Sequence, residues 1–119
     1  MPAKQDSLSE KLARFHEIKI TVTGRKSGNK ISIPVWFVSE GDTVYLLPVQ
    51  GSQTQWYKNL LEKPEMHIDA RGTGGDFKIK PITDAAQVKP VVEKFRAKYG
   101  AGDVKKYYSN FDVAVVAEQ

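Results

Sequence analysis

Hydrophobic and polar residues alternate along several short stretches of the chain, a pattern typical of β-strands with one buried face. The clearest stretch is residues 18–23, where isoleucine or valine occupies every second position. Similar stretches predict a second strand at residues 31–37 and a third at residues 43–49, with a tight turn at residues 40–42 between them. These three strands are expected to form an antiparallel meander.

The second half of the chain predicts further strands. Residues 66–70 and 77–82 are strand-like segments on either side of a glycine-rich hairpin loop at residues 71–76, and residues 111–117 predict a final strand. Pro34, within the second strand, has no N–H to donate, so we expect it at a sheet edge or an irregularity.

Four segments follow a helical period instead. The first carries a possible capping box of Ser7 and Glu10, the second stops at Pro64, and the third stops at Gly100. Pro90 either kinks the third helix or marks where its regular part begins. The predicted helices are residues 7–17, 52–63 and 84–99, with one helical turn at 103–109.

The element order is therefore α-βββ-α-ββ-α-β. Six strands with short turns and no βαβ alternation indicate a mainly β fold with helices, a six-stranded antiparallel split β-barrel. Residues 1–17 are interpreted as an N-terminal helix or arm, and residues 18–119 as a single domain.

Composition narrows the possible functions. The 119 residues carry a formal charge of +4, too small an excess to indicate a nucleic-acid partner. The absence of cysteine excludes disulfides and thiolate chemistry, and it fits a cytoplasmic protein. No apolar run approaches the roughly 20 residues that cross a bilayer, so no integral membrane association is expected.

The loop at residues 23–29 is the first candidate for ligand chemistry. Its two glycines allow backbone N–H groups to converge, while arginine, lysine and serine add charge and a hydroxyl donor. Such a loop can hold a phosphate or a carboxylate. A solvated hairpin turn is the alternative interpretation, and composition alone favours it.

A second candidate is residues 48–55, which lead from a strand end into a helix. The helix N-terminus offers free N–H donors and a dipole that favours an anion. The alternative is structural: Ser52 or Thr54 caps the helix and Trp56 packs in the core.

Side chains for classical catalysis are missing. His16 and His67 are the only histidines, and neither has metal-ligand spacing, so no metal site is predicted. If the protein is an enzyme, a cofactor is expected to carry the reaction.

The segments Ile20-Thr21-Val22-Thr23-Gly24-Arg25-Lys26-Ser27-Gly28, Pro34, Trp56-Tyr57-Lys58-Asn59-Leu60 and Pro64 together resemble the deazaflavin-dependent nitroreductase family. That family belongs to the flavin/deazaflavin oxidoreductases, which include the pyridoxamine-phosphate-oxidase-like split barrels. The resemblance runs from about residue 18 to residue 70. It implies a homodimer of the FMN-binding split-barrel type that uses coenzyme F420 or, in related branches, FMN.

The resemblance also implies roles for particular residues. The phosphate and acidic tail of the cofactor would be held by Arg25, Lys26, Ser27 and Gly28. The ring pocket would be lined by Pro34, Val35 and Trp36, bordered by Val49, Gln50, Gly51 and Ser52, and supported by Trp56, Tyr57 and Asn59. The C-terminal Tyr107 and Tyr108 would face substrate, one of them as a possible proton donor.

One departure from the family keeps the choice of cofactor open. Residues 50–55 have a single glycine and no charge, where family members often carry a basic residue and paired glycines. The leading hypothesis is an F420-dependent oxidoreductase that transfers a hydride to a small electron-poor acceptor such as a quinone, enone or nitro compound. The alternatives are an FMN-binding reductase, a non-catalytic flavin- or deazaflavin-binding protein and, least favoured, a single-stranded nucleic-acid binder.

Overall fold

The computed structural model describes residues 11, 12, 14–41 and 43–118. Across these residues, seven strands form one sheet in the order β2-β1-β5-β6-β7-β4-β3, and all neighbouring strands are antiparallel. The strands are β1 (Ile18–Thr23), β2 (Lys30–Val35), β3 (Val38–Glu40), β4 (Thr43–Leu46), β5 (Glu65–Ala70), β6 (Thr73–Ile82) and β7 (Ala114–Glu118).

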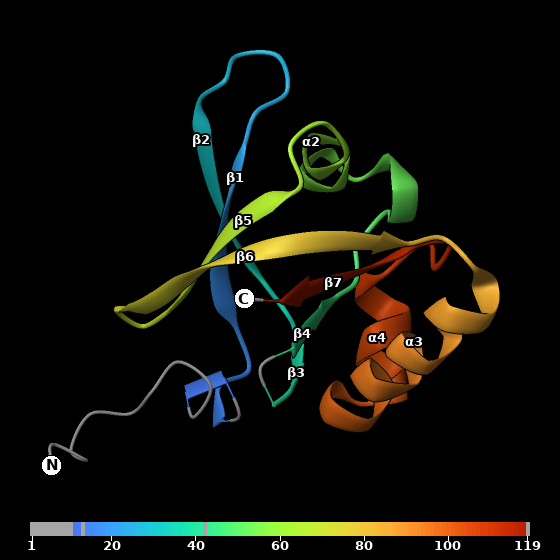
Figure 1. Cartoon of the computed structure of the whole chain (residues 1–119). Coiled ribbons are helices and arrows are strands. Elements are labelled where there is room, and N and C mark those ends of the chain that lie inside the picture. Colours follow the sequence, from blue (N-terminus) through green and yellow to red (C-terminus); the bar gives the residue numbers. More distant parts are fainter. Residues whose placement is uncertain (1–10, 13, 42, 119) are drawn as a thin grey trace, which may run out of the picture.

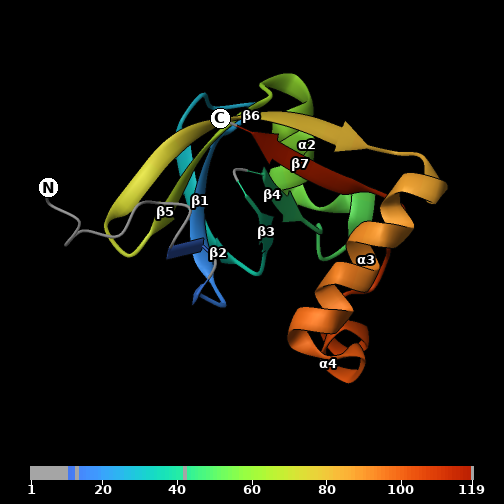
Figure 2. The ribbon, with the colours of Figure 1, turned by 60° about the horizontal axis from the view of Figure 1, so that its bottom comes forward.

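A short segment of the chain joins the two edge strands of the sheet. β2 and β3 lie at opposite ends of the strand order, yet only Trp36 and Phe37 separate them in the chain. The sheet therefore has to curl so that its edges approach each other, as Figures 1 and 2 show. The result is the expected mainly β split barrel with helices, in the form of a half-barrel.

The strand predicted at residues 31–37 ends at Val35, and a further short strand, β3, follows at Val38–Glu40, which corrects the count from six to seven among the described residues. The backbone of Phe37 leaves the sheet because side chains of another element bond it: its N–H donates to Tyr99 Oη at 3.0 Å, and its carbonyl accepts from Tyr99 and Lys98. The predicted meander is also wrong, since β2 pairs only with β1 and β3 pairs with β4. The edge position expected for Pro34 is confirmed.

Other strand boundaries differ by a few residues. The predicted loop at residues 71–76 is reduced to a turn at Arg71 and Gly72, both with positive φ, and β6 begins at Thr73. Gly74 pairs within the sheet beneath His67, whose ring leaves no room for a Cβ there. The strand predicted at 43–49 ends at Leu46, and the last strand begins at Ala114 rather than at residue 111.

Three α-helices and one 3₁₀ turn are present in the described residues: η1 (Gly51–Gln53), α2 (Gln55–Glu62), α3 (Ala85–Tyr99) and α4 (Ala101–Tyr107). Asp84 caps α3 by accepting from the N–H of Ala86 at 2.9 Å. Gly100 ends α3 with φ of 95°, as its position predicts. Pro90 lies inside α3 and does not mark its start. The single helix predicted at 52–63 is divided at Thr54, and the turn predicted at 103–109 is α4.

The helix predicted at residues 7–17 falls largely outside the described residues, as do Ser7 and Glu10. Residues 11, 12 and 14 are helical, and the helix ends before Phe15. Leu12 is buried in the barrel core, and Phe15 packs against it.

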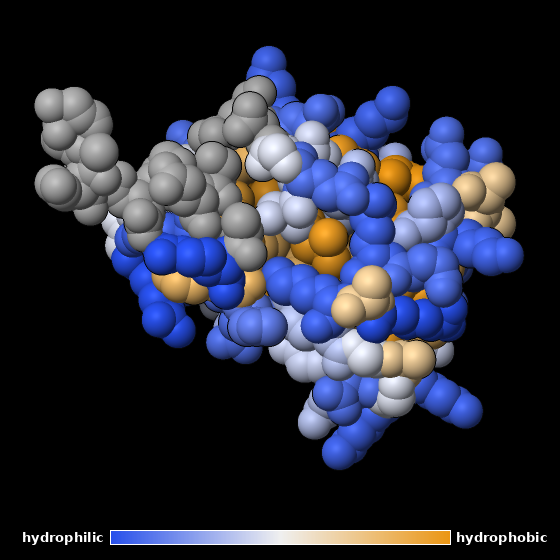
Figure 3. Space-filling view, turned by 90° about the horizontal axis from the view of Figure 1, so that it is seen from below, coloured by the Kyte–Doolittle hydropathy of each residue, from blue (hydrophilic) through white to orange (hydrophobic). Residues whose placement is uncertain are grey.

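The hydrophobic residues form two clusters. The first fills the barrel between the sheet and α2, and includes the alternating residues Ile18, Ile20 and Val22 of β1. The second lies between β3, β4 and the pair α3–α4, around the fully buried Phe95. Viewed from below, the surface is mostly hydrophilic, with hydrophobic residues visible near its middle (Figure 3).

Candidate functional site

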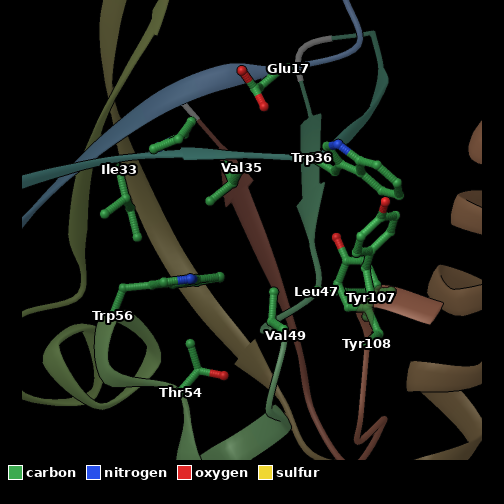
Figure 4. A pocket seen from close by; sticks show the side chains of 11 residues that line it. Glu17, Ile33, Val35, Trp36, Leu47, Val49, Thr54, Trp56, Tyr107 and Tyr108 are labelled. Atoms are coloured by element: carbon green, nitrogen blue, oxygen red, sulfur yellow. The ribbon is translucent and has the colours of Figure 1, made fainter. Parts of the chain in front are cut away.

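A cavity of about 600 Å³ lies where β2 passes into β3, a size within the usual range of small-molecule pockets. Residues from four separate parts of the chain line it (Figure 4). They are Glu17, Ile33, Pro34, Val35, Trp36, Leu47, Val49, Thr54, Trp56, Tyr107 and Tyr108.

One side of the cavity is built from aromatic rings around Trp36, and we refer to Trp36, Tyr99, Tyr107, Tyr108 and Phe95 as the aromatic cluster. The Trp36 ring stacks on Tyr99, with centroids 4.3 Å apart and planes at 9°, and meets the edge of Tyr107 at 5.5 Å. The ring of Phe95 contacts the rings of Tyr99 and Tyr108, with centroids 5.9 and 6.0 Å apart. The stacking fixes the plane in which Trp36 faces the cavity.

Two tyrosines of the aromatic cluster, Tyr99 and Tyr108, have raised pKa values. Burial raises the pKa of Tyr99 to about 12, although its hydrogen bond to the Phe37 carbonyl opposes that shift. Burial also raises the pKa of Tyr108, which is only 6% exposed. Tyr107 is half-exposed at the end of α4. Tyr108 therefore gives the lining of the cavity a neutral hydroxyl group that can donate a hydrogen bond.

The opposite side of the cavity comes from α2 and the turn before it. Trp56 is buried in the first turn of α2, and its ring reaches toward Val49 in Figure 4. The hydroxyl of Thr54 accepts from the N–H of Gln50 at 2.8 Å and so ties the start of the helix to the preceding turn. Trp56 thus keeps both roles considered for it, a core residue that also lines the cavity.

The basic loop between β1 and β2 is hydrogen-bonded to α2. Arg25 donates to Asn59 Oδ1 from Nη1 at 2.7 Å and from its backbone N–H at 3.2 Å, and to Gln55 Oε1 at 2.9 Å. Ser27 Oγ accepts from the N–H of Asn29, which closes the loop locally. Lys26 is exposed and makes no such contact among the described residues.

The segment that follows β4 is held by the chain after α4. The N–H and hydroxyl of Ser52 donate to the carboxylate of Asp112 at 2.9 and 2.6 Å, and these bonds lower the pKa of Asp112. The N–H of Ser109 donates to the Val49 carbonyl at 2.9 Å. Gly51 has φ of 58° and no room for a Cβ beside Asp112 and Asn110. Only glycine fits there without strain.

The structure gathers some of the predicted site residues and separates others. Seven of them line the cavity together: Pro34, Val35, Trp36, Val49, Trp56, Tyr107 and Tyr108. The other nine do not line it. Tyr57 and Asn59 are buried on α2. The segment after Val49 contains Gln50, Gly51 and Ser52, and the loop between β1 and β2 contains Arg25, Lys26, Ser27 and Gly28.

Four residues of the cavity were not predicted from the sequence: Glu17, Ile33, Leu47 and Thr54. Ile33 shares a strand with Val35, so the alternation of β2 contains a signal for it. Glu17 directly precedes β1, and the register that pairs Ile18 with Val35 places it beside Trp36, so the predicted hairpin of these two strands contains a signal for it.

Neither histidine lines the cavity. His67 Nδ1 lies 2.8 Å from Asp76 Oδ1 on the exposed face of the sheet, and His16 is exposed with its ring edge near Tyr99. No group of three potential metal ligands occurs among the described residues. Within the same residues, no helix is long and apolar enough to cross a membrane.

Residues 9–116 match the sequence model of a family described as uncharacterized proteins conserved in bacteria, DUF2255. No curated protein matches the chain.

Solved structures share the fold at low sequence identity. One is an F420-H2-dependent reductase, FDR-A, with 17% identity, a TM-score of 0.67 and coverage of 87% of this chain and 94% of that one. A second is HutZ, the heme storage protein from Vibrio cholerae, with 12% identity, a TM-score of 0.70 and coverage of 94% and 86%. A third, described as a domain-swapped dimer, has 17% identity, a TM-score of 0.69 and coverage of 87% and 80%.

Proposed function

Because the chain belongs to the bacterial DUF2255 family, whose description states no activity, we propose from the site itself that it is a flavin- or deazaflavin-binding reductase. The observation that carries the proposal is the cavity beside Trp36, an apolar and aromatic space of about 600 Å³ at the opening of a split barrel. The fold shared with an F420-H2-dependent reductase supports it.

The residues present fit the ring system of such a cofactor. Ile33, Val35 and Trp56 offer apolar surface, and the rings of the aromatic cluster offer planar surface on the other side. Aromatic side chains favour offset stacking with other rings. A tricyclic ring would therefore be held mainly by burial and stacking, with the neighbouring hydroxyls to orient it.

The anionic part of the cofactor has fewer partners in this chain. Arg25 already donates to Asn59 and Gln55, so Lys26 is the basic side chain of the loop that is available to an anion among the described residues. The segment at 50–53 adds no charge. We propose F420 as the cofactor and FMN as the alternative.

A bound deazaflavin or flavin, when reduced, supplies a hydride to an electron-poor acceptor. The side chains of the protein position the ring, exclude water and donate hydrogen bonds. Tyr108 stays protonated because burial raises its pKa, and it lines the cavity, so it is the proposed proton donor to the acceptor, with Tyr107 as the second candidate. Quinones, enones and nitro compounds are acceptors of the right kind.

A homodimer is part of the proposal. The half-barrel leaves the cavity open on one side, and one protein of the same fold is described as a domain-swapped dimer. A second copy would close that side and exclude water. Size-exclusion chromatography with light scattering at several concentrations tests this; a monomer at all of them would overturn it.

The function is tested by titrating the purified protein with F420 and, separately, with FMN, followed by cofactor fluorescence. Saturable binding at micromolar concentration is expected for one of them. Val49→Trp fills the cavity from a residue that is 43% exposed and should abolish binding, while Leu61→Trp, at a residue 53% exposed and away from the cavity, should not. If neither cofactor binds, the proposal is wrong. Tight binding without reduction of any acceptor would instead identify a non-catalytic binding protein.

A further inference from the structure

The cavity has an unusual balance of charge for a site that is expected to hold an anionic cofactor. Among the described residues that line it, Glu17 is the only charged side chain, and no lysine or arginine is present. Four of the other lining residues are aromatic: Trp36, Trp56, Tyr107 and Tyr108. Rings together with one carboxylate are the side chains that favour an organic cation.

The carboxylate of Glu17 is available to a ligand. No hydrogen bond or ion pair holds it among the described residues, and the residue is exposed. Figure 4 shows it at the same end of the cavity as Trp36, across from Trp56. The negative charge of Glu17 acts on the aromatic cluster. Burial is the main cause that raises the pKa of Tyr99, and the charge of Glu17 raises it further.

Nearby cations do not neutralise this end of the cavity. Lys98 Nζ donates to the Phe37 carbonyl at 2.9 Å and lies over the Phe37 ring, behind Trp36. Arg14, Lys19 and Arg71 line the adjoining hollow, which shares Glu17 and Pro34 with the cavity, but none of the three lines the cavity itself.

The aromatic cluster already attracts ammonium groups on its outer faces. Lys98 Nζ lies 5.2 Å from the centroid of Tyr99, and Lys106 Nζ lies 5.3 Å from that of Tyr107. Both distances are within the range of cation–π attraction, about 6 Å. The rings of Trp36 and Trp56, which line the cavity, have the same electrostatic character, and no cation lies over either of them among the described residues.

We propose that this cavity selects a planar aromatic cation as its small-molecule ligand, stacked on the ring of Trp36 with its charge toward Glu17, while the cofactor ring takes the end of the cavity at Trp56. The proposal rests on the proposed function for the role of that ligand, which is the substrate that meets the cofactor. A carboxylate-bearing ring of the same size is disfavoured, because its charge would lie beside Glu17 with no basic side chain in the lining.

The chain offers a direct probe of this cavity. Its two tryptophans are Trp36 and Trp56, and both line the cavity, so intrinsic fluorescence reports on the site. The test is a titration with N-methylquinolinium, a two-ring cation, and with 1-naphthoate, a two-ring anion of similar size. Saturable quenching gives the dissociation constants, and calorimetry checks them.

We expect the cation to bind at least about tenfold more tightly than the anion, a free-energy difference typical of one favourable charge contact. Glu17→Gln should bring the two probes to within about twofold to threefold of each other, and the exposed Glu62→Gln, with the same loss of charge away from the cavity, should retain the preference. Equal affinities in the unmodified protein, failure of both probes to bind, or a preference that survives Glu17→Gln would each overturn the proposal.

Titration of the same preparations with F420 and FMN separates this proposal from the proposed function. Selective cation binding without binding of either cofactor would overturn the reductase and leave the cation site. Cofactor binding together with equal affinity for the two probes would overturn only the selection of a cation.

Discussion

The two sides of the cavity are stabilised by different interactions. The α2 side is positioned by directional hydrogen bonds: Arg25 bonds Asn59, and Thr54 bonds Gln50. The aromatic cluster is positioned by the contact of large buried rings, with the Tyr99 hydroxyl bridging backbone atoms of His16 and Phe37. A hydrogen bond contributes about 1 kcal/mol net to stability, whereas burial of one aromatic ring contributes several. The aromatic cluster should therefore dominate the stability of the site.

A third region connects the two sides. The segment around Gly51 and Ser52 precedes α2 and is bonded by Asp112, which follows the aromatic cluster in the chain. Here a turn of defined backbone geometry and a carboxylate act together. Substitutions in the three regions should consequently differ in size and in pH dependence.

The largest effect is expected at Phe95. The ring is 0% exposed and contacts Tyr99 and Tyr108, so Phe95→Ala leaves a cavity beneath the aromatic cluster. We expect a loss of about 3–5 kcal/mol in the free energy of unfolding, measured by urea denaturation. Leu61→Ala, which removes an exposed apolar side chain from the α2 side, should change stability by less than about 0.5 kcal/mol. Similar losses for the two variants would contradict the comparison.

The barrel core could be predicted from the sequence because strand periodicity is local. Ile18, Ile20 and Val22 alternate in the sequence, and all three are buried in the core next to α2. The turn at Gly41 and the stop at Gly100 follow from local backbone preferences in the same way. Seven of the sixteen predicted site residues also line the cavity, and for Pro34, Val35 and Trp56 the reason is that β2 and the start of α2 carry them.

The aromatic cluster could not be predicted, because long-range contacts create it. Phe37 and Tyr99 are 62 positions apart, and no periodicity relates them. The bonds between them hold the backbone of Phe37 in the connection from β2 to β3, where the predicted strand at residues 31–37 has already ended. The bonding of Arg25 to α2 likewise depends on the packed structure, whereas Glu17 reaches the site through the local pairing of β1 with β2.

Gly51→Ala tests the connection between the two sides. The backbone of Gly51 is left-handed, a conformation that is strained for alanine, and the added Cβ collides with Asp112. The hydrogen bonds between Asp112 and Ser52 are therefore disrupted. We expect a loss of roughly 2–4 kcal/mol from backbone strain and lost hydrogen bonds. Gly41→Ala is the matched control: its φ is 60°, its Cβ meets no atom within 4 Å, and it should lose only about 1–2 kcal/mol. Equal losses would mean that the contact with Asp112 is unimportant.

Lys98, which lies beside Tyr99 of the aromatic cluster, should make the stability of the protein depend on pH. Burial lowers the pKa of Lys98 to about 8, so between that value and its ordinary value of about 10 the unfolded chain binds the proton that the folded chain releases. Stability should therefore rise with pH in this window, by at most about 1.4 kcal/mol per pH unit. Urea denaturation at about pH 8, 9 and 10 should show this rise in the unmodified protein and not in Lys98→Met. A flat profile in both proteins would contradict the pKa shift.

Arg25→Ala tests the hydrogen-bonded side. The substitution removes the side-chain donor to the buried Asn59 and to Gln55, and we expect a loss of about 1–2 kcal/mol. Lys26→Ala should leave stability within about 0.5 kcal/mol, although it should weaken binding of F420 or FMN. A reversed result, with Lys26 the residue needed for stability, would show that the loop does not hold α2 as described.

The smallest effect is expected at Asp112, where acid should act on the connecting segment alone. The hydrogen bonds from Ser52 lower the pKa of this carboxyl, so they contribute stability at pH values above its ordinary pKa, and that contribution is lost as the pH falls through the lowered value. Asp112→Asn should therefore be less stable than the unmodified protein at neutral pH, and the difference should shrink on acidification below about pH 4. Because Asp112 is exposed, the difference should be smaller than that of Arg25→Ala. An unchanged difference at low pH would mean that Ser52 bonds the protonated side chain as well as the charged one, and the connection between the two sides would then not depend on charge.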